Sequence, residues 1–356
     1  MHEYLDLIQA LSEAHGVSGF ETDVRKVIEK RLEGKAEISK DILGNVFLKK
    51  AGKPGEPKIM VEAHMDEVGF MVSGIKGNYI KFVPLGVWWD QTLLSNKVII
   101  KTNKGDVKGV IGSKPPHIMT PQDAAAVYPK KFMFIDVGAA SAKEIAEMGI
   151  RIGDPIVPDT YFEALNENVF LGKAFDCRLG CAAVTALLDG LDGGEHPNTV
   201  YGVGTVQEEL GCRGAVTAVN TVRPDLCIAI EGGYTTDLPG CEMADSAAYL
   251  GGGPCVAVMD AGMIPNTALL EFVRKTAEEN HIPIQLGCTP AGTDAGTIQK
   301  FGSGIPTVLM ALPARYIHTY NSLFNYKDFE MMLQLLQCMV KKLDKETVDG
   351  IRSGQY

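Results

Sequence analysis

The chain has 356 residues, of which 46% are hydrophobic and 22% charged, a composition typical of a globular protein with one large core or two smaller ones. Its 34 Lys and Arg against 44 Asp and Glu give a net charge of −10. Because no basic patch dominates, nucleic acid is not expected as a partner. No run approaches the roughly 18 consecutive apolar residues of a membrane span, so no membrane association is expected.

The N-terminal segment mixes acidic with apolar residues, so we expect no signal peptide there and a cytoplasmic protein. The eight cysteines show no C-x-x-C spacing, which argues against a zinc ribbon or a thioredoxin-like motif. In a reducing compartment they are expected to be small buried hydrophobic residues rather than disulfides. Cys177 stands out only because Asp176 precedes it.

In chain order, an amphipathic helix is followed by a second one over about 18–32. The spacing of Ser18 and Glu21 predicts a capping box at the start of this second helix. Strand-like apolar runs then follow at 45–50 and 58–64. These elements are typical of the beginning of an α/β domain.

The pattern changes at about residue 71. From there to residue 164, short strands alternate with Gly, Pro and Asn turn signals, which indicates a small β-rich domain. From 165 onward, helices alternate with strands again. We therefore expect an α/β fold with a mostly parallel sheet flanked by helices, built from 1–70 and 165–356, with the region 71–164 inserted into it.

Acids and histidines follow several of the predicted strands. Ligands of an open α/β sheet bind outside the carboxyl ends of its strands, so these side chains are expected to meet. His64 closes an apolar strand, and Asp66 lies two residues further on, where an extended chain faces the same side. Asp176 is also compatible with an ordinary helix N-cap. The candidate metal ligands are His64, Asp176, Glu209, Glu231 and His318.

Two imidazoles and three carboxylates suit a pair of divalent ions that share one carboxylate. This mixture of nitrogen and oxygen ligands favours Zn²⁺, with Co²⁺ or Mn²⁺ as alternatives, over Ca²⁺ or Mg²⁺. Glu208 and Glu209 stand side by side after a hydrophobic strand. A solvated turn is one interpretation of this pair. The favoured one is a metal ligand next to a general base.

The pattern resembles the glutamyl or deblocking aminopeptidases, a family of dinuclear metallopeptidases that includes the tetrahedral aminopeptidases. The matching stretches run from residue 17 to residue 319 and are VSGFE, EAHMDEVGF, IGSKPPH, KAFDCRLG, VQEELGCRGA, IEGGYTTDLPG, AGTDAG and ARYIHT. The resemblance implies a zinc-peptidase-like fold whose inserted β-barrel-like domain serves dimerisation. It also implies assembly up to hollow dodecamers that admit short peptides as substrates.

The resemblance implies how the ligands divide between two ions. Asp176 would bridge both of them. His64 and His318 would hold one ion, and Glu209 and Glu231 would hold the other.

Further roles follow from the same resemblance. Glu208 would be the general base that takes a proton from the attacking water and passes it to the leaving amine, and Asp66 would support His64. The chain departs from the family at Cys177, where Asp is frequent, and at Glu231, where many members have Asp. At position 231 either Asp or Glu can coordinate a metal, so the site is expected to persist.

Four further residues are candidates for substrate binding. His117 lies in the inserted region and is equally compatible with a loop histidine that has no catalytic role. Thr293 and Asp294 follow a strand, where a turn with a hydrogen-bonding Asp is the alternative. Arg315 is a candidate for binding a substrate carboxylate or a neighbouring subunit.

The expected activity is removal of the N-terminal residue from short peptides. Three alternatives remain open at this point. An endoglucanase-like carbohydrase would use paired carboxylates but has no need for two histidines. A metal-dependent deacylase or carboxypeptidase would use the same ligands on a different substrate end. A non-enzymatic scaffold would not need the ligand set.

Overall fold

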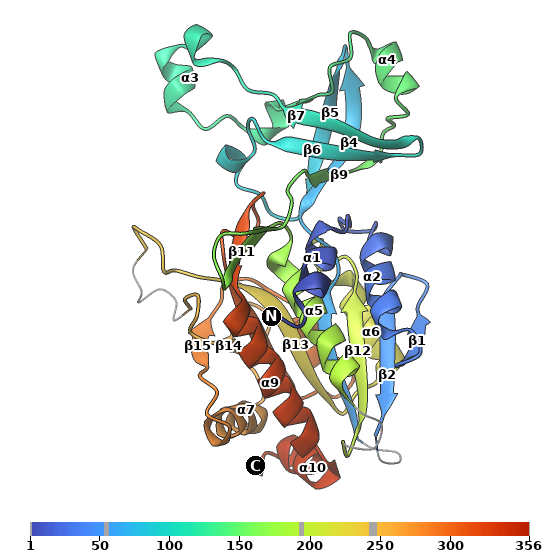
Figure 1. Ribbon diagram of the computed structural model, residues 1–356, viewed down its shortest axis with the longest axis vertical. Helices are drawn as coiled ribbons and strands as arrows, with labels where there is room; N and C mark the ends of the chain where they lie inside the picture. Colours follow the sequence, from blue (N-terminus) through green and yellow to red (C-terminus); the bar gives the residue numbers. More distant parts are fainter. Residues whose placement is uncertain (1, 53–56, 192–195, 242–247, 356) are drawn as a thin grey trace.

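The computed structural model describes residues 2–52, 57–191, 196–241 and 248–355. It consists of a large α/β domain and a smaller β-barrel that stands on one end of it (Figure 1). The chain enters the barrel through β4 (Gly69–Lys76), directly after β3 (Lys58–His64), and leaves it after β9 (Pro155–Pro158). The predicted α/β fold with an inserted barrel is confirmed.

The large domain is built on one mixed sheet with the strand order β1-β2-β12-β3-β13-β16-β17-β11-β10. Its central pairs, β12 with β3, β3 with β13, and β13 with β16, are parallel, and the outer pairs are antiparallel. The strands β14 and β15 extend this sheet beside β16. The bounds not yet given are β1 (Glu37–Lys40), β2 (Val46–Ala51), β10 (Glu163–Ala164), β11 (Val169–Gly172), β12 (Thr199–Thr205), β13 (Leu226–Tyr234), β14 (Cys255–Met259), β15 (Gln285–Cys288), β16 (Thr307–Arg315) and β17 (Ser322–Asn325).

Helices cover both faces of the sheet, which explains why the central strands are continuous apolar runs. One face packs against α1, α2, α5, α7, α9 and α10, and the other packs against α6 and α8. A buried Leu, Ile or Val side chain in these layers contributes roughly 1.5–3 kcal/mol. The helices are α1 (Leu5–Glu13), α2 (Thr22–Leu32), α5 (Phe175–Gly190), α6 (Arg213–Val222), α7 (Thr267–Glu279), α8 (Asp294–Gln299), α9 (Tyr326–Lys342) and α10 (Lys345–Ser353).

The barrel closes in the order β4-β5-β8-β7-β6-β9. Its interior is apolar, and the Phe70 ring stacks on Trp88 with ring centroids 4.9 Å apart. Its outer surface also carries large apolar side chains. Among them, Trp89 is 64% exposed and Phe132 is 55% exposed. The remaining barrel elements are β5 (Tyr79–Leu85), β6 (Lys97–Thr102), β7 (Gly105–Ile111), β8 (Ile135–Asp136), α3 (Pro121–Ala125) and α4 (Ala142–Glu147).

The capping box expected at the second helix is wrong. Helix α2 begins at Thr22 after Glu21, and no side chain caps its first turn. The Ser18 hydroxyl instead donates a hydrogen bond to Asp66 Oδ2 at 2.6 Å. The Glu21 carboxylate accepts from the backbone N–H groups of Gly19 and Gln207. Both side chains are drawn away from the helix end by tertiary contacts that local spacing does not reveal.

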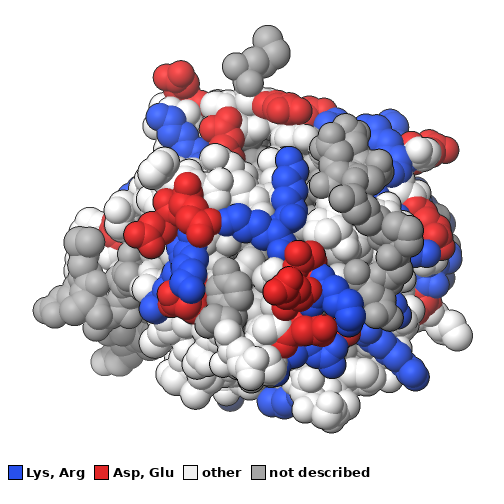
Figure 2. All heavy atoms as spheres, turned by 90° about the horizontal axis from the view of Figure 1, so that it is seen from below, with Lys and Arg blue, Asp and Glu red and all other residues white. Residues whose placement is uncertain are grey.

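Figure 2 shows the end of the molecule opposite the barrel, where acidic and basic side chains are interspersed. Helix α10 contributes ion pairs there, with Arg352 Nη1 at 2.7 Å from Asp225 Oδ1 and Lys345 Nζ at 3.2 Å from Asp349 Oδ2. In the described part of the chain, no helix has both the length and the apolar character that crossing a membrane requires.

Candidate metal centre

The five expected ligands converge at the carboxyl ends of the central strands. His64 is the last residue of β3, and Glu231 lies near the end of β13. Glu209 follows β12, His318 follows β16, and Asp176 lies in the first turn of α5. All five line one cavity of about 630 Å³. The parallel arrangement of neighbouring strands brings residues together that lie more than a hundred positions apart in the sequence.

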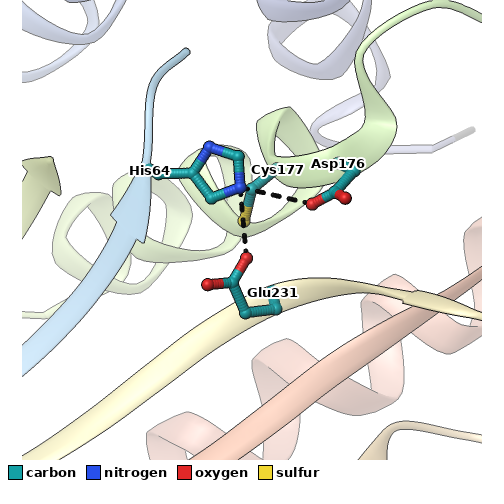
Figure 3. A group of neighbouring side chains, drawn as sticks. All are labelled: His64, Asp176, Cys177 and Glu231. Carbon is teal, nitrogen blue, oxygen red and sulfur yellow. Dashed lines mark hydrogen bonds and ion pairs between the residues drawn. The ribbon is translucent and has the colours of Figure 1, made fainter. Parts of the chain in front are cut away.

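The first ligand group surrounds His64 (Figure 3). Its Nε2 lies 3.3 Å from Asp176 Oδ1 and 3.2 Å from Glu231 Oε2. Cys177 lies beside this group, but its thiol donates to the backbone oxygen of Ile230 at 3.0 Å. The thiol proton is thus used within the protein, and burial raises the pKa of the Cys177 thiol well above its ordinary value.

The second group surrounds His318. Its Nε2 lies 3.2 Å from Asp176 Oδ2 and 3.3 Å from Glu209 Oε1. Asp176 therefore offers one oxygen to each group, which is the geometry expected of a bridging carboxylate. The grouping of the other ligands differs from the expectation. His64 stands with Glu231 and His318 stands with Glu209, because the two histidines approach Asp176 from opposite oxygens.

Both imidazoles are oriented by backbone oxygens. His64 Nδ1 lies 3.0 Å from the carbonyl oxygen of Asp66, and His318 Nδ1 lies 2.9 Å from that of Val87. A carbonyl oxygen only accepts, so each Nδ1 carries a hydrogen, and in the neutral ring Nε2 is the nitrogen that presents a lone pair toward the carboxylates. Carboxylate oxygens are also acceptors. A cation between these facing acceptors satisfies both, so the residues present fit divalent metal ions.

The pKa shifts of the side chains in the cavity also fit the binding of divalent ions. Burial raises the pKa of Glu208 to about 9, with His64 opposing the shift and the nearby carboxylates, Glu231 first among them, adding to it. Burial lowers the pKa of His318, but its hydrogen bonds to Asp176 and Glu209 prevail and raise it to about 11. Both pKa values are raised, because several carboxylates and two imidazoles are buried together in one site. Dications in the same place would restore the charged carboxylates and the neutral rings.

Asp66 positions the segment that carries Glu208. Its Oδ1 accepts from the backbone N–H of Glu208 at 3.0 Å, and its Oδ2 accepts from that of Glu209 at 3.1 Å. Its Oδ1 also lies 3.4 Å from His64 Nδ1. The carboxylate expected to support His64 therefore also fixes the backbone of Glu208 and Glu209, and Ser18 holds it in turn.

The four expected substrate-binding residues separate in the structure. Thr293 lines the cavity, and its hydroxyl donates to Asp260 Oδ2 at 2.8 Å. Asp294 lies behind the wall, where it accepts from the Thr205 hydroxyl at 2.7 Å. Arg315 does not line the cavity, because its guanidinium pairs with Asp237. His117 is exposed in a short turn of the barrel, away from the cavity wall of its own chain.

The sequence reasoning missed two buried carboxylates next to the centre. Glu62 is 1% exposed, and neither of its oxygens has a hydrogen-bond partner among the described residues. It lies two residues before His64 on β3, so strand alternation could have placed it on the same face. Glu67 accepts from Lys173 Nζ at 2.7 Å and from Arg178 Nη2 at 3.4 Å. No spacing in the sequence links these three residues.

The chain is similar to known aminopeptidases over nearly its whole length. The putative aminopeptidase FrvX of Escherichia coli is 37% identical over 97% of each chain. The glutamyl aminopeptidase of Lactococcus lactis is 35% identical over 99% of each chain. The lysyl aminopeptidase of Pyrococcus furiosus is 34% identical over 95% of this chain and 97% of its own.

Solved structures agree with these relatives. A TET aminopeptidase from a marine-sediment Thaumarchaeota archaeon has a TM-score of 0.94 at 40% identity, over 98% of this chain and 99% of its own. The dodecameric structure PhTET1-12s has a TM-score of 0.86 at 29% identity, over 95% of this chain and 99% of its own. The model of the M42 glutamyl aminopeptidase family matches residues 44–335. The fold, the cavity and these matches together show that the chain belongs to the M42 glutamyl aminopeptidase family.

Proposed function

We propose that the protein is a metal-dependent aminopeptidase that removes the N-terminal residue of short peptides with two divalent ions, Zn²⁺ or else Co²⁺ or Mn²⁺. The observation that carries this proposal is the division of Asp176 between two ligand groups beside Glu208. Each group pairs one histidine with one further carboxylate, which is the donor set of a borderline metal.

The residues have separate tasks in this reaction. His64, Asp176 and Glu231 would hold one ion, and His318, Asp176 and Glu209 would hold the other. When bound, the ions supply a water of lowered pKa and polarise the scissile carbonyl. Glu208 accepts the proton of that water and delivers it to the leaving amine, so that hydrolysis balances without any other donor. Asp66 accepts a hydrogen bond from the Glu208 backbone N–H and so holds Glu208 in place beside the candidate ligands.

The test combines metal removal with two variants. Dialysis against EDTA should abolish hydrolysis of aminoacyl p-nitroanilides, and Zn²⁺, Co²⁺ or Mn²⁺ should restore it. Glu208→Gln should lower kcat by at least ~10²-fold while elemental analysis still finds metal. Asp176→Ala should lose metal from both groups. Full activity after EDTA would contradict metal dependence, and near-normal turnover by Glu208→Gln would remove its role as base.

We also propose that the protein self-associates through the inserted barrel, from dimers up to a dodecamer. The exposed apolar side chains on the barrel surface support this, because large exposed apolar areas commonly mark protein–protein contacts. The dodecameric relative supports it as well. Light scattering of the purified protein measures the assembly directly, and a monomer at micromolar concentration would contradict the proposal.

A further inference from the structure

The wall of the cavity beyond the metal centre is apolar. It is formed by the neighbouring strands β14, β15 and β16 and contains Cys255, Val256, Ala257, Leu286, Leu309 and Ala311. A volume of about 630 Å³ lies in the range of sites that enclose small organic ligands. The space is therefore sufficient for the first residue of a peptide as well as the ions.

The charges of the cavity all belong to the catalytic end. Its acidic side chains are those of Asp176, Glu208, Glu209 and Glu231, and none of the described residues that line it is Lys or Arg. Arg315, the basic residue expected to face substrate, is held by Asp237 with its Nε 3.1 Å from Oδ1. The segment 242–247, which lies outside the described residues, contains no Lys or Arg in its sequence.

Two polar side chains of the cavity lining, those of Gln285 and Thr293, already have hydrogen-bond partners within the protein. Gln285 Nε2 donates to the backbone oxygens of Tyr249 at 3.1 Å and Gly253 at 2.8 Å, and its Oε1 accepts from the Tyr249 N–H at 3.0 Å. Burial raises the pKa of the Cys255 thiol to about 12, so this thiol is neutral at pH 7. The Thr293 hydroxyl is engaged by Asp260.

We propose that this wall is the side-chain subsite of the aminopeptidase and that it selects an uncharged, apolar N-terminal residue such as Leu or Met over Glu and Lys. The proposal rests on the proposed function and adds its substrate class. A carboxylate or an ammonium placed against this wall would lose its hydration without gaining a partner, whereas an apolar side chain gains from burial. The preference differs from the activities named for the glutamyl and lysyl relatives.

The first experiment compares kcat/KM for Leu-, Met-, Glu- and Lys-p-nitroanilide on the Zn²⁺-loaded protein. Leu and Met should exceed both Glu and Lys by at least ~10-fold. A value for Glu or Lys equal to or above that for Leu would overturn the subsite assignment while leaving the aminopeptidase intact. No hydrolysis of any anilide or dipeptide would instead overturn the proposed function.

The second experiment places a charge in the wall. Leu286 is 38% exposed and lines the cavity, so Leu286→Lys should fold and should raise the ratio of kcat/KM for Glu over Leu by at least ~10-fold. Leu286→Asn is the neutral control at the same position. Val216→Lys adds the same charge to the exposed side of α6, outside the cavity lining. Neither control should change the ratio by more than about twofold.

Cys288→Lys repeats the charge on the same strand at another exposed lining position, with Cys288→Ser as its neutral control, in case Leu286→Lys fails to fold. Circular dichroism and metal content verify that each variant is folded and loaded. If both Lys variants are folded and neither changes the ratio of Glu to Leu, the wall does not contact the substrate side chain and the proposal is wrong.

Discussion

The α/β domain buries side chains of types that are usually exposed, whereas the barrel exposes side chains of types that are usually buried. The α/β domain buries ionisable side chains, among them Glu62, His64 and Glu67, in an interior that is otherwise apolar. The barrel has an ordinary apolar interior and exposes Trp89 and Phe132 to solvent. Buried charge costs free energy unless it is paired, and exposed apolar area costs free energy unless it is covered. The first region therefore has the features expected of a catalytic site, and the second has those expected of a contact surface.

This difference predicts how mutations in the two regions divide between folding, catalysis and assembly. Changes to buried charges should destabilise the chain itself. Changes to the exposed barrel surface should leave the chain stable and alter its association. The following predictions test this division in order of their expected effect on the free energy of unfolding.

The largest effect is expected at Glu67. Lys173 and Arg178 are both about 1% exposed, and Glu67→Ala would leave these two cations without their carboxylate. The free energy of unfolding should fall by about 3–5 kcal/mol, measured by denaturant titration. Asp349→Ala, which breaks an exposed pair with Lys345 on α10, is the control and should cost only about 0.3–0.5 kcal/mol. Equal losses at the two positions would contradict the comparison.

A smaller effect should depend on pH. Burial raises the pKa of Asp328 to about 6, although the N–H groups of Gly251 and Gly253 oppose the shift. The folded chain then keeps this proton where the unfolded chain, with a pKa near 3.9, has lost it. Stability should decrease as pH rises from about 4 to about 6, by at most about 3 kcal/mol, and then remain level. Denaturant titrations of wild type and Asp328→Asn across this window measure the difference, and identical slopes would refute it.

Ser18→Ala should have a moderate effect with a catalytic signature. It removes the 2.6 Å hydrogen bond to Asp66 Oδ2 and should lower the free energy of unfolding by about 1.5 kcal/mol. Because Asp66 fixes the Glu208 backbone, kcat should fall by about 3- to 10-fold while metal content and KM remain unchanged. Ser18→Thr keeps a hydroxyl and should recover most of the loss. If Thr is no better than Ala, the hydroxyl does not position Asp66.

The smallest effect on the chain's own stability is expected on the barrel. The double change Trp89→Glu and Phe132→Glu alters two exposed side chains and should shift the free energy of unfolding by no more than about 0.5 kcal/mol. Light scattering should nevertheless show dissociation into smaller species, because two acidic groups would enter an apolar contact. Ile42→Glu, on an exposed residue of the α/β domain, is the matched control. Intact assembly of the double variant would place the contact elsewhere.

The sequence predicted most of the architecture because its signals are local. Apolar runs followed by His64, Glu209 and Glu231 marked the ends of parallel strands, and strand ends of one sheet meet at one edge. The division of the ligands between His64 and His318 did not follow, because it depends on which oxygen of Asp176 each ring approaches. The contacts of Ser18 and Glu67 could not be predicted either, because their partners are distant in the sequence. The spacing of Ser18 and Glu21 resembles a capping box, and Glu67 belongs to no recognisable motif.

The carbonyl of Val87 has a consequence for how this centre can vary in evolution. It belongs to the barrel, yet it orients His318 in the other domain. Every residue type has a backbone carbonyl, so a substitution of Val87 would not remove this hydrogen bond. The adjacent Gly86 has a φ of +81°, and a Cβ at this position would lie 2.5 Å from Val68 Cγ1 and 2.8 Å from Glu209 Oε2. Gly86 lies outside the set of candidate ligands. Replacing it should nevertheless displace the neighbouring carbonyl of Val87 and so disturb His318 in the other domain.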